Sequence, residues 1–348
     1  MIIREFGANK KGEPARLFIF ENQNGMELHV SDFGATLHKL MVPDKNGVKR
    51  DVVLGYDDPV AYEGPAGTFF GATVGRHANR IGKGTFECDG VRYQLDKNNG
   101  NNNLHSGLDF WSFRIWHVKE TTEQSITFSL HSPDGDQGYP GTVEVDVRYT
   151  LTENNSVVID YYATTDADTP INMTNHSYFN LSGHESGTVR EQILWIDGDG
   201  FTRTDSELIP TGEIILVEGT PMDFRVGKKI GLDIDCDYEP LNIGRGYDHN
   251  WTLNNCGEFR KVAELRSEES GICMEVLTDL PGIQIYTANY VQNESGKNGV
   301  IYQQNQGVCF ETQYYPDSVN HENFKSCICK KDAEYKTKTE FRFHTDTL

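Results

Sequence analysis

Two short β-type segments of the sequence carry a histidine and a glutamate of the kind that transfer protons. In the first, TNHSYFNL, alternation along an extended chain places Thr174, His176, Tyr178 and Asn180 on one face. A strand of a plain sandwich has one apolar face, whereas this segment is polar on both. A polar group buried without a partner costs about 1–3 kcal/mol, so the segment needs a polar network or a ligand. Taken alone, His176 is explained equally well as a structural histidine.

The second segment, VCFETQYYP, places Cys309, Glu311 and Gln313 on one face and Phe310 on the other. A carboxylate in the middle of a β run is uncommon unless it faces solvent, because a buried one must be paired or functional. A solvated Glu311 on an edge strand is the alternative. Since imidazole titrates at about 6.5, a protonated histidine and an ionised glutamate suit general acid–base catalysis near neutral pH.

Further polar clusters are weak signals when each is taken singly. GRHANRI (75–81) is followed by an asparagine-rich turn (98–107) that contains His105, and GYDHNW (246–251) crowds Asp248, a histidine and a tryptophan together. Asparagine and glycine simply tolerate left-handed backbone, so the turn alone indicates a loop. Aromatic faces beside carboxylates and amides are typical of sugar sites, and also of aromatic-rich turns.

The elements that must position these residues are predicted to be β-strands. Strand–turn–strand patterns surround Asn24-Gly25 and Asp89-Gly90, and Val143, Val145 and Val147 alternate with polar residues. Amphipathic helical stretches are scarce, and neither an internal repeat nor a linker divides the chain. The sequence therefore predicts an all-β fold: one domain over residues 1–348, a large antiparallel β-sandwich with few short helices.

The charge of the chain limits the kinds of molecule that it can be expected to bind. The formal charge of −20 disfavours nucleic acid and anionic membranes, but a small neutral ligand suffers no penalty. Seven scattered cysteines are unlike a disulfide framework, and neither a signal peptide nor an apolar run long enough to span a bilayer is evident. These features predict a soluble cytoplasmic protein, monomeric or homodimeric.

No cofactor motif accompanies the polar clusters. The sequence has no dinucleotide or phosphate loop, nucleophile elbow or HExxH zinc motif. Cys327-Ile-Cys329 is the one close cysteine pair, and without a second pair it is better explained as incidental than as a metal site. Chemistry without a cofactor or metal is therefore expected.

Taken together, the segments resemble the aldose 1-epimerase (galactose mutarotase) family. The matching pieces occur in the family's order: GRHANRI (75–81), NNNLHSG (101–107), TNHSYFNLSG (174–183), YDHNW (247–251), PGIQIYTANY (281–290) and FETQYYPDSVNHENF (310–324). Ser106 and Lys325 depart from the family's commonest pattern, and neither is a proposed catalytic position.

The resemblance implies a large β-sandwich with the sugar in an open cleft, His176 as general acid and Glu311 as general base. It also implies a set of substrate-binding residues: Asn79, Arg80, His105, Tyr178, Asp248 and Gln284. The implied reaction interconverts the α and β anomers of free aldohexoses such as glucose and galactose.

Other functions compete with this one. Glycoside hydrolysis normally needs two carboxylates, whereas the recognisable pair here is one histidine and one glutamate. An epimerase of a sugar phosphate would need clustered cations, and beyond Arg76 and Arg80 the motifs offer few; an epimerase of a rarer hexose stays open. A non-catalytic carbohydrate-binding protein would not need both an acid and a base.

Overall fold

Antiparallel sheets form most of the regular structure in the computed structural model, which describes residues 1–64 and 68–345. The largest sheet runs in the order β11 (His117–Thr121), β12 (Ser125–Ser132), β13 (Val143–Leu151), β14 (Ser156–Thr165), β30 (Glu334–Thr345), β24 (Ile272–Thr278), β23 (Arg260–Arg266), β18 (Ile193–Ile196), β21 (Lys228–Lys229). The second runs β17 (Tyr178–Phe179), β28 (Val308–Gln313), β25 (Gly282–Tyr286), β22 (Asp248–Thr252), β19 (Gly200–Thr204), β20 (Pro210–Leu216). The third runs β1 (Ile2–Ala8), β2 (Pro14–Glu21), β3 (Glu27–Ser31), β4 (Thr36–Pro43), β5 (Lys49–Asp51).

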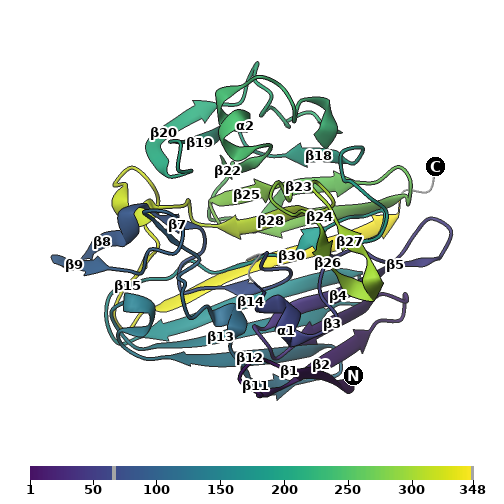
Figure 1. The fold of residues 1–348 in the computed structure, drawn as a ribbon, viewed down its shortest axis with the longest axis horizontal. Coiled ribbons are helices and arrows are strands. Elements are labelled where there is room, and N and C mark those ends of the chain that lie inside the picture. Colours follow the sequence, from purple (N-terminus) through teal and green to yellow (C-terminus); the bar gives the residue numbers. More distant parts are fainter. Residues whose placement is uncertain (65–67, 346–348) are drawn as a thin grey trace.

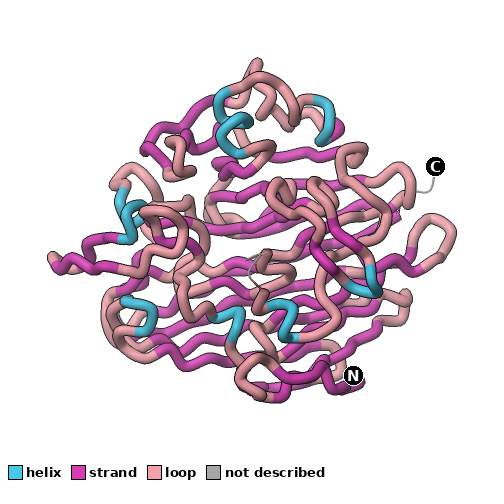
Figure 2. Tube along the Cα trace, viewed as in Figure 1, coloured by secondary structure: helices cyan, strands magenta, loops and turns pink. Residues whose placement is uncertain are grey.

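Short ladders and single helical turns complete the described part of the chain. The two-stranded ladders are β6 (Thr73–Val74) with β16 (Thr174–Asn175), β7 (Arg80–Ile81) with β10 (Asn103–Leu104), β8 (Thr85–Cys88) with β9 (Val91–Gln94), β15 (Thr169–Pro170) with β29 (Ile328–Cys329), and β26 (Glu294–Ser295) with β27 (Ile301–Tyr302). The α-helices are α1 (Pro59–Tyr62) and α2 (Glu239–Gly244), and 3-10 turns occupy Gly82–Gly84, Trp111–Phe113, Asp136–Gly138, Ile230–Leu232, Lys297–Gly299 and Ser318–Asn320. Figure 2 shows how little of the trace is helical.

The sheets stack on one another through apolar side chains. Phe179 of β17 contacts Phe310 of β28 and, from the other sheet, Phe341 of β30, with ring centroids 4.8 Å apart in the Phe179–Phe341 pair. Phe18 of β2 meets Phe128 of β12 in the same way. In Figure 1, the yellow strand β30 crosses the middle of the molecule, between the N-terminal strands and those of the second sheet. This is the β-sandwich that the alternating pattern predicts, and the prediction of few short helices is confirmed.

Local predictions hold where turn chemistry and alternation are strong. Strands flank both predicted turns, and Gly25 and Gly90 have the positive φ values, 82° and 73°, that such turns require. In β13, Val143, Val145 and Val147 are buried and alternate with less buried residues. Among the described residues, no helix is long and apolar enough to cross a membrane.

One local expectation was wrong, and one alternative is excluded. The segment 174–181 is not one alternating strand, because pairing stops after Asn175 and resumes at Tyr178. Asn180 consequently turns away from His176 and donates to the backbone oxygens of Gly187 and Gln306. The solvated edge position considered for Glu311 is also excluded, because β28 lies between β17 and β25 and Glu311 is 2% exposed.

Candidate active site

A cavity of about 720 Å³ lies over one face of the second sheet. In β22, β25 and β28, the residues Trp251, Ile283, Ile285 and Phe310 face the apolar core. The alternate positions face the other way, and they supply Asp248, Tyr286 and Glu311 to the cavity wall. Because pleating sends successive side chains to opposite faces, the same strands build the core and the polar site.

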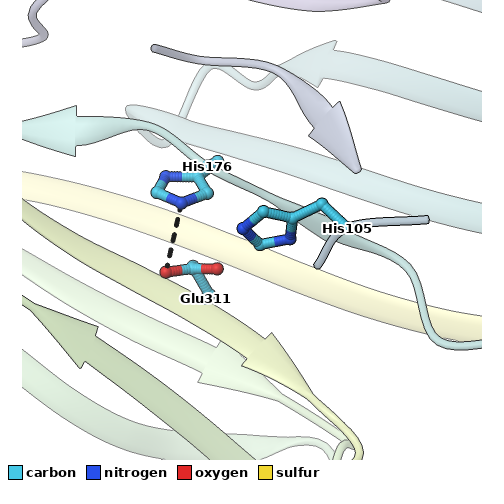
Figure 3. A group of neighbouring side chains, drawn as sticks. All are labelled: His105, His176 and Glu311. Atoms are coloured by element: carbon cyan, nitrogen blue, oxygen red, sulfur yellow. Dashed lines mark ion pairs between the residues drawn. The ribbon is translucent and has the colours of Figure 1, made fainter. Parts of the chain in front are cut away.

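His176 and Glu311 face each other within this cavity. Their Nε2 and Oε1 atoms are 3.6 Å apart, and the side chains are 6% and 3% exposed. Figure 3 shows the His176 ring over the Glu311 carboxyl group, with the ring of His105 beside them and turned toward the same space. The structure thus brings together the two side chains that the sequence singled out from distant segments.

Backbone pairing and aromatic contacts hold the His176 ring in place. The backbone N–H of His176 donates to Ala72, and its carbonyl accepts from Gly71. The ring stacks against Tyr178 at 5.1 Å between centroids and against Phe69 at 5.9 Å. These contacts fix the plane of the ring.

His105 is fixed by a reciprocal pair of hydrogen bonds with Asn79. The backbone N–H of His105 donates to the Asn79 carbonyl, and the Asn79 N–H donates to Nδ1 of the His105 ring, both at 3.0 Å. A neutral ring that accepts at Nδ1 carries its proton on Nε2. His105 therefore offers a hydrogen-bond donor, and burial lowers its pKa well below the usual value.

The loops that carry these groups have left-handed backbone at residues other than glycine. Phe69, Asn79 and His105 have φ values of 55°, 62° and 54°. This conformation is uncommon outside glycine and often marks functional sites. Here it turns three side chains into the cavity from otherwise tight loops.

Further charged and amide groups lie around the same cavity. Arg80 donates from Nε to Asn99, and Asp248 accepts from the side-chain amide of Gln284 at 2.7 Å. Gln284 lies directly across the strand pair from Glu311, but it does not line the cavity. Its hydrogen bond to Asp248 would allow it to hold that carboxyl group in one orientation.

Burial shifts the proton affinities of the facing pair in opposite directions. It lowers the pKa of His176 to about 4. Burial also raises the pKa of Glu311 well above its usual value, repulsion from Asp248 adds to this, and Arg80 opposes it. The sequence suggested a charged pair at neutral pH; burial favours the neutral pair instead, because the surroundings penalise separate charges.

The donor set of His105, His176 and Glu311 does not suit a metal, although one ligand atom from each lies within 4.8 Å of the others. A metal-binding imidazole usually donates its second N–H to a neighbour. In His105 the second nitrogen accepts from the backbone, so the remaining nitrogen holds a proton and has no lone pair for a metal.

The structure places most of the predicted site residues on one cavity. Asn79, Arg80, His105, His176, Tyr178, Asp248 and Glu311 line it, and Gln284 lies just beneath. Sequence reasoning missed Phe69 and Tyr286. Tyr286 could have been predicted from strand alternation, because it lies two residues after Gln284 on the same strand face. Phe69 belongs to no polar cluster, so no sequence pattern pointed to it.

An all-β sandwich with a polar cavity and a buried histidine–glutamate pair defines a class of small-molecule enzymes, and comparisons with known proteins identify the group within it. Residues 16–342 match the family model of aldose 1-epimerase. The chain is 40% identical over 319 residues to a galactose mutarotase of Bos taurus, covering 91% of each chain. It is 38% identical over 338 residues to an aldose 1-epimerase of Haemophilus influenzae, covering 95% of this chain and 96% of that one.

Solved structures agree with the sequence comparisons. An aldose epimerase homologue from C. elegans superposes with a TM-score of 0.88 at 31% identity, over 96% of this chain and all of that one. A galactose 1-epimerase from Lactobacillus acidophilus gives a TM-score of 0.86 at 25% identity, over 99% of each chain. The chain belongs to the aldose 1-epimerase family, which confirms the resemblance that the motifs suggested.

Proposed function

We propose that this protein interconverts the α and β anomers of free aldohexoses such as glucose and galactose. The observation that carries the proposal is the His176–Glu311 pair, whose facing atoms lie 3.6 Å apart in a polar cavity. The names of the relatives, galactose mutarotase and aldose 1-epimerase, support the same activity.

In the proposed reaction, Glu311 removes the proton of the C1 hydroxyl while His176 delivers one to the ring oxygen. The C1–O5 bond breaks and leaves the open-chain aldehyde. Rotation about C1–C2 presents the other face of the carbonyl group, and reversal of the proton transfers closes the opposite anomer. Both residues return to their starting protonation states, so no other reactant is consumed.

Ring opening leaves both His176 and Glu311 uncharged. His176 loses its proton to the sugar and Glu311 gains one, which gives the neutral state that burial favours. The protonated imidazole is therefore a stronger acid, and the carboxylate a stronger base, than either group is in water.

The remaining polar groups are proposed to bind the sugar. The Nε2–H of His105 and the guanidinium of Arg80 would donate to the ring oxygen or neighbouring hydroxyls and stabilise developing negative charge. Asp248 and Asn79 would bind further hydroxyls, and Tyr178 supports the His176 ring. Gln284 acts through Asp248.

The cavity favours a free sugar over a sugar phosphate. Among the described lining residues, Arg80 is the single lysine or arginine, and Glu207, Asp248 and Glu311 are acidic. Arg76, the other cation of the motifs, is fully buried and donates to backbone oxygens of Pro140 and Gly141. An anionic phosphate would therefore find little compensation for its charge.

Polarimetry on freshly dissolved α-D-glucose and α-D-galactose tests the proposal. We expect optical rotation to relax faster with the purified protein than in buffer alone. Relaxation at the buffer rate for both sugars would sink the proposal for them. Binding of these sugars without any acceleration of their mutarotation would instead indicate a carbohydrate-binding protein.

His176→Asn and Glu311→Gln are each expected to lower kcat by roughly 10²–10⁴, the usual contribution of a general acid or base. The matched controls are His131→Asn and Glu144→Gln, which alter an exposed histidine–glutamate ion pair between β12 and β13. The control variants should keep wild-type rates, and all four proteins should keep the wild-type circular dichroism spectrum. A wild-type rate in either site variant removes that residue from its role.

We also propose that the protein works in the cytoplasm. The support is chemical: Cys236 and Cys256 are exposed free thiols, which persist in a reducing compartment.

A further inference from the structure

Strand β28 presents one side chain to each nitrogen of the His176 ring. Glu311 lies 3.6 Å from Nε2, and Cys309, two residues earlier on the same strand face, has its sulfur 3.5 Å from Nδ1. Cys309 is fully buried, directly opposite Tyr178 on β17 and Tyr286 on β25. The two ring nitrogens therefore meet different partners: an ionisable carboxyl group at Nε2 and a thiol at Nδ1.

The thiol is the one titratable side chain with a hydrogen bond to Nδ1 in the described structure. The other titratable groups around the ring are His105, whose centroid is 5.3 Å away, Tyr178, stacked on it, Tyr286, edge-on at 6.3 Å, and Glu311 at Nε2. Burial keeps the pKa of the Cys309 thiol well above its usual value, so sulfur stays neutral and accepts a hydrogen bond weakly.

We propose that Cys309 is a positioning residue whose sulfur accepts the Nδ1–H of His176, so that Nε2 is the nitrogen that gains and loses the proton. The inference rests on the proposed function. A proton retained on Nδ1 leaves Nε2 free to receive a proton from Glu311 or to deliver one to the ring oxygen. The two histidines of the cavity thus hold opposite tautomers, because Nδ1 of His105 accepts from the backbone.

A weak acceptor at Nδ1 also suits the chemistry. A carboxylate or carbonyl in that place would stabilise the imidazolium and make it a poorer acid. A neutral thiol orients the ring with little such stabilisation. His176 then stays a strong proton donor to the ring oxygen.

The competing partner is the backbone carbonyl of His176 itself, which favours the protonated ring and already accepts from Gly71. If that carbonyl alone held the Nδ1 proton, Cys309 would be a packing residue. Cys309→Ala and Cys309→Ser, which differ by one hydroxyl group, separate these cases.

Loss of the acceptor in Cys309→Ala should lower kcat by about fivefold to tenfold, the effect of one hydrogen bond, with KM within twofold of wild type. Cys309→Ser should keep kcat within about threefold and move the acidic limit of the pH–rate profile to higher pH, because a hydroxyl oxygen is a better acceptor than sulfur. Wild-type kcat in the alanine variant, or an unmoved acidic limit in the serine variant, would overturn the proposal.

Nitrogen-15 NMR of histidine-labelled, sugar-free protein reads the tautomer without any turnover. With His176 assigned by its loss in His176→Asn, we expect neutral His176 to be protonated at Nδ1 and bare at Nε2 in wild type and Cys309→Ser, and mixed in Cys309→Ala. A wild-type tautomer in the alanine variant contradicts the proposal. Because the spectrum needs no activity, wild-type protein that fails in polarimetry would refute the proposed function and leave the tautomer readable.

Discussion

At the scale of single residues, the chemistry depends on how burial distributes one proton between two groups. His176 and Glu311 are both buried, and their pKa values move toward and past each other. The proposed active form, protonated His176 with ionised Glu311, carries the same number of protons as the neutral pair. The two forms therefore remain in a constant ratio wherever the pair holds one proton.

The pH profile of kcat/KM follows from this proton count. Below a pH of about 4, the pKa of His176, both groups are protonated and the base is lost. Above the raised pKa of Glu311 the pair holds no proton and the acid is lost. We expect a plateau in buffer-corrected polarimetry that begins near pH 5 and extends up to the raised pKa of Glu311. Unperturbed groups would instead lose activity tenfold per pH unit above about 6.5, and such a decline would contradict the expected plateau.

The sequence revealed the residue types of the site better than their roles. Alternation in β28 predicted the face of Glu311, because strand pleating is local. The same rule failed for Asn180, since pairing with β6 ends at Asn175 and tertiary contacts redirect the chain. The shifted pKa values depend on burial by distant segments, so no local pattern contains them. Gln284 is predicted to contact the sugar, and its hydrogen bond to Asp248 could be seen only in the folded packing.

At the scale of elements, the segment around Gly71 sets the position of His176. Gly71 donates to the His176 carbonyl and accepts from the Asn175 side chain. Its φ is +65°, and a Cβ there would lie 1.9 Å from the Leu37 carbonyl oxygen. Two independent reasons therefore require glycine at this position: the backbone conformation and the close approach of another strand.

Gly71→Ala tests this requirement against a matched control. Gly90→Ala has a similar φ of +73° with nothing near the added methyl group, so it should lose about 1–2 kcal/mol from left-handed strain alone. Gly71→Ala should lose about 1–3 kcal/mol more through the clash, and kcat should fall as His176 shifts. Urea unfolding and polarimetry measure both effects. Equal stability of the two variants would show that the Leu37 contact relaxes without penalty.

At the scale of the whole molecule, we propose that residues 1–348 fold as a single domain. The support is one continuous apolar cluster that draws from all three large sheets, with Leu28 and Leu40, Val145 and Phe341, and Ile283 and Phe310 among its members. Cutting the chain at any strand would expose part of this cluster. The absence of a linker pattern pointed the same way, because a boundary normally falls where few contacts cross.

A single domain should unfold in one step. We expect urea transitions followed by near-ultraviolet and far-ultraviolet circular dichroism to coincide, because side-chain packing and strand pairing depend on the same core. Two separated transitions, or midpoints that differ between the two signals, would indicate independently folding parts.

Alternate residues of β28 face the apolar core and the cavity. This alternation limits where the gene can gain or lose codons. Deleting the codon of Val308 or Cys309 would shift the rest of the strand by one position, turning Phe310 toward the cavity and Glu311 toward the core. The protein would lose its proposed base and bury a carboxylate in a single event. The Asp89-Gly90 turn, where a side chain at Gly90 meets open space, is expected to tolerate such events. Natural length variation should therefore accumulate in the turns and spare β28.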